Sequence, residues 1–245
     1  MKPILLIGGA GYIGTVLTEH LLSNKHKVRC IDNLAYEQHG VLKLFLKNKN
    51  YEFHNSDIRD KNLIKEHFNG IETVVLLAGI VGDPISKKYP SITTEVNLKG
   101  TYNVINICEE KKIKRLIYIS TCSNYGITDT NKIADENHKL KPLSLYAKTK
   151  VEIENFLINL NKKKELKPTI LRFATAFGLS PRMRFDLTVS EFTKQLALGK
   201  ELEVYDPNTW RPYCHTRDFA NFIHQVITAK VDDVAFEIFN VGDNR

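Results

Sequence analysis

The sequence predicts an α/β fold in which helices cover both faces of a doubly wound parallel sheet. Short apolar runs alternate with longer amphipathic stretches along residues 1–174. Within most runs the apolar residues follow one another without interruption, which is typical of strands that are buried on both faces of a sheet. The alternation of such strands with helices indicates a parallel sheet with helical crossovers.

The predicted elements follow this alternation along the chain. Strands are expected near residues 3–8, 27–31, 51–53, 72–78, 114–120 and 168–173. Helices, with apolar residues three and four apart, are expected near residues 12–23, 38–47, 60–68, 94–111 and 145–162.

The pattern changes after residue 174. Two further helices are expected near 187–198 and 217–229, and two short strands near 202–205 and 235–241. We therefore divide the chain into a sheet domain, residues 1–174, and a smaller lobe, residues 175–245, with segments that return to the sheet domain. The length of 245 residues suits one large domain with part of a second.

Composition and charge favour a soluble chain that does not bind nucleic acid. Hydrophobic residues make up 42% of the chain, and its apolar runs fall short of the roughly 20 residues that a membrane-spanning helix needs. Basic residues outnumber acidic ones by 35 to 28. The lysines are spread along the chain, and the densest run, 162–164, ends a predicted helix, where positive charge suits the helix dipole. We expect a solvated surface, with attraction of an anionic small molecule as the functional alternative.

Cysteine usage and the N-terminus favour the cytoplasm. Cys30, Cys108, Cys122 and Cys214 form neither a C-x-x-C pair nor a disulfide framework, which suits a reducing compartment. The eight histidines lack the spacing of metal ligands, so no metal is expected. The N-terminal apolar run is too short for a signal peptide and lacks a cleavage region. We therefore expect a cytoplasmic protein with no membrane partner.

A glycine-rich turn follows the first predicted strand and opens the first helix. Its glycines, Gly8, Gly11 and Gly14, form the pattern G-x-x-G-x-x-G. Such glycines allow a tight turn and a close approach of the backbone to a pyrophosphate at the helix N-terminus. A simple strand-to-helix turn is the alternative, but the second strand ends in Asp32, where the hydroxyls of a bound ribose would lie. Together these features predict a Rossmann-type dinucleotide site.

The acidic residues at the ends of the second and third strands indicate the kind of dinucleotide. Asp32 would accept hydrogen bonds from ribose hydroxyls and repel a 2′-phosphate, so NAD is favoured over NADP. Asn33, rather than an arginine or lysine, follows it. Asp57 follows the third strand, where its carboxylate would accept the adenine amino group. Capping of the next helix by Asp57 or Asp60 is an equally good explanation.

A tyrosine and a lysine near the start of a predicted helix point to proton transfer. Tyr146 and Lys150 are four residues apart, so both side chains project from one helical face. A neighbouring ammonium favours the phenolate and lowers the pKa of tyrosine, which is otherwise near 10. The strand before them ends in hydroxyl residues, Ser120, Thr121 and Ser123, at the edge of the sheet where ligands bind. A hydroxyl-rich loop and a surface pair are the structural alternatives, but their combination favours an enzyme.

These residues, in this order, resemble the extended short-chain dehydrogenase/reductase superfamily in its NAD-dependent epimerase/dehydratase branch. Typical members are UDP-galactose 4-epimerases and nucleotide-sugar 4,6-dehydratases. The resemblance covers essentially the whole chain, from G-G-A-G-Y-I-G at 8–14 through S-T-C-S-N-Y-G at 120–126 and Y-A-K-T-K at 146–150 to R-P-Y-C-H-T-R-D at 211–218.

The resemblance implies a set of site residues. The catalytic residues would be Thr121, Tyr146 and Lys150. Lys150 would also hold the nicotinamide ribose, and Asn97 would shape the backbone near the cofactor. The implied NAD-binding residues are Gly8, Gly11, Tyr12, Ile13, Gly14, Asp32, Asn33, Asp57, Ile58, Ala78, Gly79, Asn97, Ser120, Tyr146, Lys150 and Phe173. The implied binding residues for a nucleotide-diphosphate sugar are Thr121, Cys122, Ser123, Thr175, Arg182, Arg184 and Arg211.

Departures from the family pattern bear on the reaction. The 4,6-dehydratases follow the catalytic hydroxyl with an Asp-Glu pair, whereas this chain has Cys122 and Ser123 there. Families that epimerise next to the keto group place a cysteine two residues before the motif tyrosine, a position held here by Ser123, so we interpret Cys122 as a small residue that fills the strand end. Thr175 stands where many epimerases place an asparagine, and Arg182 and Arg184 are candidates to compensate.

The leading hypothesis is an NAD-dependent nucleotide-sugar 4-epimerase that acts through a 4-keto sugar. A 4-ketoreductase is the nearest alternative, a dehydratase is less favoured, and a catalytically silent NAD-binding or RNA-associated scaffold is the alternative from another class. The helices near 94–111 and 145–162 resemble those that form a homodimer interface in this superfamily. In relatives the stretch at 239–245 leads into further helices, so we expect a truncated, incomplete C-terminal substrate lobe.

Overall fold

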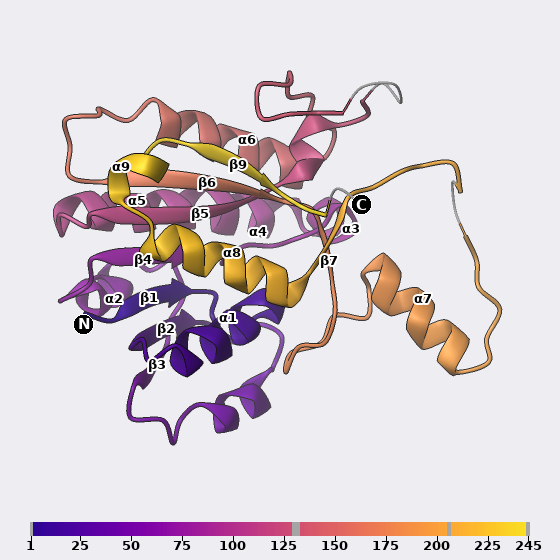
Figure 1. The fold of residues 1–245 in the computed structure, drawn as a ribbon, viewed down its shortest axis with the longest axis horizontal. Coiled ribbons are helices and arrows are strands. Elements are labelled where there is room, and N and C mark those ends of the chain that lie inside the picture. The colour runs from indigo at the N-terminus through magenta and orange to yellow at the C-terminus, as the bar shows by residue number, and fades with distance from the viewer. Residues whose placement is uncertain (1, 129–132, 205–206, 244–245) are drawn as a thin grey trace.

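The computed structural model describes residues 2–128, 133–204 and 207–243. Its centre is a seven-stranded sheet with the strand order β3-β2-β1-β4-β5-β6-β9 (Figure 1), and every neighbouring pair is parallel. The order reverses between β1 and β4, which defines the switch point where ligands bind in such sheets. Its strands are β1 (Ile4–Ile7), β2 (Val28–Asp32), β3 (Tyr51–Asn55), β4 (Thr73–Leu76), β5 (Arg115–Thr121), β6 (Lys167–Phe173) and β9 (Ile238–Val241).

Helices cover both faces of this sheet. On one face α1 and α8 pack against each other, and on the other face lie α2, α5 and α6 (Figure 1). The helices are α1 (Tyr12–Ser23), η1 (His39–Leu44), α2 (Lys61–Lys65), η2 (Glu66–Phe68), α3 (Asp83–Lys88), α4 (Pro90–Thr94), η3 (Glu95–Gly100), α5 (Thr101–Glu110), η4 (Cys122–Tyr125), α6 (Leu145–Ile158), α7 (Thr188–Ala197), α8 (Thr216–Thr228) and α9 (Val231–Val234).

Successive strand residues enter two different cores. In β1, Leu6 packs with Leu17 of α1 and Phe219 of α8, whereas Leu5 and Ile7 belong to the core beneath α5 and α6. These strand side chains are fully or almost fully buried. Because adjacent residues point to opposite faces and both faces are covered, the central strand β1 is apolar throughout, whereas the edge strand β3 carries exposed Glu52 and Asn55. The predicted α/β class and parallel sheet are confirmed.

Three predicted elements differ from the structure. The helix expected near 38–47 is the short 3-10 helix η1. The strand expected near 202–205 is wrong over 202–204, where the chain has no regular structure and Val204 is exposed, so no buried face exists for a strand to present; residue 205 lies outside the described residues. The helix expected near 94–111 is three consecutive elements, α4, the π-helix η3 and α5.

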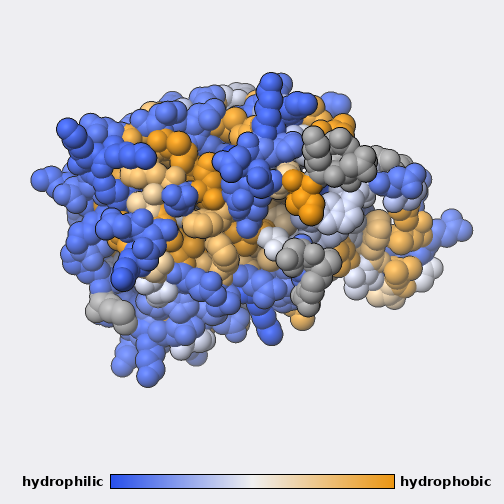
Figure 2. Space-filling model, turned by 45° about the horizontal axis from the view of Figure 1, so that its top comes forward, coloured by the Kyte–Doolittle hydropathy of each residue, from blue (hydrophilic) through white to orange (hydrophobic). Residues whose placement is uncertain are grey.

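After β6 the chain forms a small second layer of structure beside the sheet. Strand β7 (Thr175–Phe177) pairs in parallel with β8 (Tyr213–His215), and α7 stands away from the main sheet (Figure 1). Apolar side chains gather over α7 in Figure 2, where Val189, Leu196 and Leu198 are exposed. The chain then returns, because α8 covers the sheet and β9 pairs with β6. In the described part of the chain, no helix is long and apolar enough to cross a membrane.

Candidate active site

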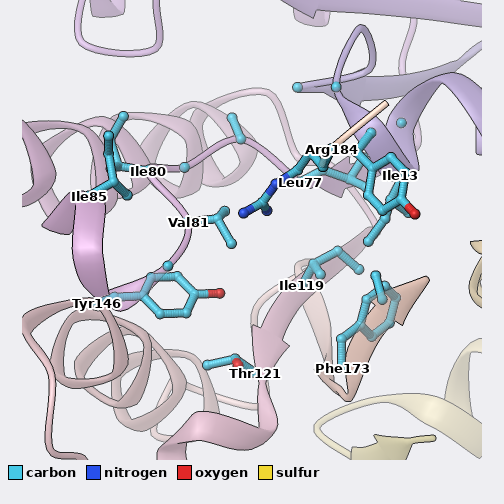
Figure 3. A pocket seen from close by; sticks show the side chains of 18 of the residues that line it. Ile13, Leu77, Ile80, Val81, Ile85, Ile119, Thr121, Tyr146, Phe173 and Arg184 are labelled. Atoms are coloured by element: carbon cyan, nitrogen blue, oxygen red, sulfur yellow. The ribbon is translucent and has the colours of Figure 1, made fainter. Parts of the chain in front are cut away.

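A cleft of about 830 Å³ opens at the carboxyl ends of β1, β2, β4 and β5. It lies at the switch point of the sheet, where a ligand is expected in such folds. All of the site residues predicted from the sequence line this cleft except Asn97. Figure 3 shows Tyr146, Thr121 and Arg184 around one part of the cavity, with Ile13 and Phe173 at another. The fold therefore gathers, in one cleft, predicted site residues from elements that are far apart along the chain.

The glycine turn leaves room for a phosphate group and for close packing. A Cβ atom on Gly8 would lie 2.6 Å from the backbone nitrogen of Ala78, and Gly8 has a positive φ of 87°. A Cβ on Gly14 would lie 2.5 Å from the carbonyl oxygen of Gly8. Helix α1 begins after Gly11 with no side-chain cap and no acidic residue in its first turn. Its N-terminal N–H groups thus suit a pyrophosphate, so these residues fit a dinucleotide.

Gly14→Ala is expected to lower the free energy of unfolding by about 1–3 kcal/mol and to weaken dinucleotide binding. The new methyl group would meet backbone atoms of Gly8 and Gly9, which cannot move aside as a flexible side chain would. Urea unfolding and calorimetric titration with NAD measure the two effects. Gly40→Ala is the matched control, because a Cβ there meets no atom within 4 Å. Equal stability of the two variants would contradict this account.

The carboxylate of Asp32 is fixed at the end of β2. Oδ2 accepts the N–H of Ala10 at 3.0 Å, and Oδ1 accepts the N–H of Leu34 at 2.9 Å and the side-chain amide of Gln38 at 3.3 Å. Burial raises the pKa of this carboxyl, while the two backbone N–H groups and the charge of Arg182 act to lower it. The carboxylate faces the cleft, where the sequence analysis placed an adenosine ribose.

Asp57 and Asn33 form a second polar group at the same end of the cleft. Asn33 donates to Oδ2 of Asp57 at 2.9 Å, and Arg59 donates to both carboxylate oxygens at 3.0 and 2.8 Å. The Arg59 hydrogen bond lowers the pKa of Asp57 to about 2. Helix α2 is capped by Asp60, whose side chain accepts the N–H of Leu63 at 3.0 Å. Asp57 therefore faces the cleft without serving as the cap of α2.

Asn97 supports the cleft from behind. Its side-chain oxygen accepts the N–H of Ile80 at 2.8 Å, and its amide nitrogen donates to the carbonyl of Ile80 at 3.0 Å. These two bonds hold the backbone that follows β4, next to Gly79 and the cleft wall. Asn97 itself does not line the cleft.

Tyr146, Thr121 and Lys150 converge at the end of β5. Ser144 begins α6 as its cap by accepting the N–H of Ala147, which places Tyr146 and Lys150 one turn apart on the buried face. Thr121 lies beside Tyr146 at the edge of the cleft and acts to lower the pKa of Tyr146. Lys150 donates to the carbonyl of Ile119 at 2.7 Å, and its Nζ lies 6.0 Å from the centre of the Tyr146 ring. The side chains of Tyr146, Thr121 and Lys150 are buried.

The pKa of Tyr146 differs from the sequence-based expectation in direction as well as in cause, so the expected lowering by Lys150 is wrong. Burial raises this pKa above its ordinary value, and the groups that act to lower it are Thr121 and the charge of Arg184 rather than Lys150. The charge of Asp83 acts in the opposite direction. In Figure 3 the Arg184 guanidinium extends toward the same space as the Tyr146 hydroxyl. Positive charge inside the cleft therefore favours the phenolate form of this tyrosine.

Lys150 gives a pH dependence of stability with a defined sign. Burial lowers the pKa of its ammonium to about 8. The unfolded chain, with an ordinary lysine pKa near 10.4, binds more protons between these values, so stability rises with pH across this window. Relative to Lys150→Met, the wild-type free energy of unfolding should increase by on the order of 3 kcal/mol between pH 7 and 10. Urea unfolding at both pH values measures it.

Lys148→Met is the matched control for this experiment, because Lys148 is exposed on the same helix. Its difference from wild type should not change with pH. A Lys150→Met difference that is equally independent of pH would contradict the titration of a buried amine.

The residues predicted to bind substrate divide between the two ends of the cleft. Cys122, Ser123, Thr175 and Arg211 line the cleft together with Thr121. Burial raises the pKa of the Cys122 thiol, and Arg211 acts to lower it. Arg184 pairs with Asp186, with Nε–Oδ1 and Nη2–Oδ2 distances of 3.1 and 2.5 Å. Arg182 instead stacks on Tyr36, four residues after Asp32.

Sequence reasoning missed several polar residues of the cleft. Asp83, at the start of α3, lines the cavity and acts electrostatically on Tyr146. Tyr36 and Gln38 line the other end, and Asp186 lies beside Arg184. The only sequence signal for Asp83 is its place in the loop that follows β4, since such loops border the ligand site. No local pattern marks the other three residues.

A buried ion pair lies behind the catalytic residues. Glu154, two helical turns after Tyr146, pairs with Arg172 of β6 at 2.7 Å, and both side chains are almost fully buried. Glu154 also accepts the side-chain amide of Asn124 at 2.8 Å, and Asn124 donates to Ser120 at 3.0 Å. Glu154 therefore joins α6, which carries Tyr146, to β6 through Arg172 and to the turn that follows Thr121 through Asn124.

Comparisons with known proteins agree with this fold. The model of the NAD-dependent epimerase/dehydratase family matches residues 4–242. An uncharacterised protein of Methanocaldococcus jannaschii is 32% identical over an alignment that covers 100% of this chain and 76% of that protein. UDP-glucose 4-epimerase of Bacillus subtilis is 26% identical, with 98% of this chain and 76% of that protein covered.

A solved structure is similar over almost the whole chain. UDP-glucuronic acid 4-epimerase of Bacillus cereus, in complex with UDP-glucuronic acid and NAD, has a TM-score of 0.90 and 27% sequence identity. The match covers 99% of this chain and 78% of that one. The parallel sheet, with its cleft at the switch point, is a Rossmann-type fold. More specifically, the chain belongs to the NAD-dependent epimerase/dehydratase family.

Proposed function

We propose that this chain is an NAD-dependent nucleotide-sugar 4-epimerase. The observation that carries the proposal is the convergence of Thr121, Tyr146 and Lys150 at one end of a cleft whose other end fits a dinucleotide. Relatives named as 4-epimerases, from Bacillus subtilis and Bacillus cereus, support the choice of reaction. The acid–base pair that dehydratases place directly after the catalytic hydroxyl is replaced by Cys122 and Ser123.

The residues of the chain supply binding and proton transfer. NAD, when bound, supplies the acceptor and donor of hydride at C4 of the hexose and a positive ring beside Tyr146. Tyr146 takes the proton of the C4 hydroxyl and returns it after the sugar has turned in the site. Thr121, which lines the cleft beside Tyr146, orients the C4 oxygen. Arg184 and Arg211 provide positive charge for the diphosphate, since guanidinium groups bind phosphate oxygens with two parallel donors.

Turnover with a panel of nucleotide hexoses tests the proposal. The purified chain is incubated with NAD and UDP- or dTDP-linked hexoses, and the products are separated and assigned by NMR at C4. Inversion at C4 is the expected result. Reduction of a 4-keto sugar without inversion would favour the ketoreductase, and loss of water to a 4-keto-6-deoxy product would favour the dehydratase and direct attention to Asp83. Salt-dependent RNA binding without turnover of any sugar would favour the silent scaffold.

A further inference from the structure

Three histidines form a cluster between α1 and α8, the two helices that cover one face of the sheet. His20 lies in the last turn of α1, His26 lies in the turn that follows α1, and His224 lies on α8. Nε2 of His20 is 2.9 Å from Nδ1 of His224, and Nε2 of His26 is 2.9 Å from Nε2 of His224. His224 therefore uses both of its ring nitrogens for contacts with the other two histidines.

The number of protons on this histidine cluster decides whether both contacts can be hydrogen bonds. A neutral imidazole has one N–H donor and one acceptor nitrogen. When all three rings are neutral, one outer ring donates to His224, and His224 donates to the other outer ring. One added proton makes His224 a donor to both neighbours, so both hydrogen bonds remain. A second added proton leaves two N–H groups facing each other in at least one of the contacts.

The charged residues of α1 and its following turn do not offset a second proton. Those nearest to the cluster in sequence, Glu19, Lys25 and Lys27, are exposed. Burial lowers the pKa of His26 and of His224, and among the described residues the charged groups that act on these two rings are the other histidines of the cluster.

The side of α8 and of the sheet adds only positive charge. Between Asp218 and the end of α8, the single side chain that can carry a charge is that of His224. Arg115 of β5 reaches the end of this helix and donates to the carbonyl groups of Val226 and Ala229. A second proton on the cluster would therefore place like charges on neighbouring rings with no carboxylate to pair with them.

The cluster joins two helices that share one core. Leu17 of α1 packs in the same core as Phe219 and Ile223 of α8. Helix α1 begins at the glycine turn that suits a pyrophosphate. A change in the contact between α1 and α8 therefore acts on the helix that forms one side of the cleft.

We propose that His20, His26 and His224 form a pH-sensitive latch between α1 and α8, which is closed while the three rings share at most one added proton and is opened by a second. The latch is independent of the reaction proposed above. An unfolded chain takes up three protons at these residues as the pH falls through about 6.5, the ordinary histidine pKa, whereas the latched protein takes up one. The free energy of unfolding should therefore fall as the pH falls below this value.

Urea unfolding at pH 7.5 and at pH 5.5 tests the proposal on the wild type, His224→Gln and His39→Gln. The glutamine at 224 keeps a polar side chain but takes up no proton, so His20 and His26 no longer compete with a charged neighbour. Between the two pH values the unfolding constant of the wild type should rise roughly 30- to 100-fold more than that of His224→Gln. His39 is exposed on η1 and is not part of the latch, so the matched control His39→Gln should behave as the wild type does.

NMR titration of the histidine Cε1–H signals is a second measurement that needs only the wild type. No more than one of the three latch histidines should become protonated while the protein is folded and latched. Three independent titrations near pH 6.5 would overturn the proposal. So would a wild-type unfolding constant that rises no more than that of His224→Gln. Neither measurement uses a dinucleotide or a sugar, so its outcome does not depend on the proposed function.

Discussion

Tyr146→Phe should lower kcat for C4 inversion by about 10²- to 10⁴-fold, the usual contribution of a positioned acid–base group. The phenyl ring keeps the packing of Tyr146, which is buried on α6 above the end of β5. What it loses is the hydroxyl that lies in the cleft beside Thr121 and would exchange a proton with the sugar. Steady-state kinetics, together with calorimetric titration of NAD, measure the two properties separately.

Dinucleotide affinity should change far less than kcat in Tyr146→Phe, since the phosphate turn and Asp32, at the other end of the cleft, keep their contacts. Tyr89→Phe is the matched control, because Tyr89 is partly exposed and does not line the cleft. It should keep wild-type turnover. Full activity of Tyr146→Phe would remove the tyrosine from the chemistry and with it the proposed mechanism.

Glu154→Gln should lower the free energy of unfolding by about 3–5 kcal/mol, because it leaves the Arg172 guanidinium buried without its counter-charge. Arg172 donates three hydrogen bonds to this carboxylate, at 3.2, 3.1 and 2.7 Å, and both side chains are at most 4% exposed. A domain is stable by only about 5–15 kcal/mol, so the loss is a large part of the total. Urea unfolding monitored by circular dichroism measures it.

Two further variants separate the ion pair from the local packing. Glu152→Gln changes an exposed residue of the same helix and should have little effect. The double variant Glu154→Met, Arg172→Met removes both charges and should be more stable than Glu154→Gln, since no buried charge is left unpaired. If the double variant is the less stable one, packing rather than charge would explain the loss.

The parallel sheet and the convergence of Thr121, Tyr146 and Lys150 in the cleft could be predicted because their signals are local. The glycines at 8–14 follow directly on a strand, and Tyr146 and Lys150 are one helical turn apart. Thr121 ends a strand, and parallel strands end at the same edge of a sheet. Each of these facts needs only spacing and the order of elements.

The position of Arg182 could not be predicted in this way. It depends on contacts of Gly178 and Ser180 with Tyr12 and Thr15, which are more than 160 residues earlier in the chain. Periodicity places Arg182 in a loop and gives no direction for that loop. Asp83 is similar, since its influence on Tyr146 arises from the path of the loop after β4. Residues on such connecting segments are placed by tertiary packing, whereas strand ends are placed by topology.

The π-helix η3 has a consequence for how this segment tolerates insertions and deletions. A π turn holds one residue more than an α turn, and Glu95–Gly100 contains Asn97, which holds the backbone at Ile80. Removing one residue from this turn would let the segment become a continuous α-helix, in which either Asn97 or the whole of α5 is rotated by about 100°. If α5 were the part that rotates, Val104, Ile107 and Cys108 would leave the core. The number of residues in η3 thus has to suit two contacts at once: the bonds of Asn97 to the backbone at Ile80, and the packing of α5 on the sheet.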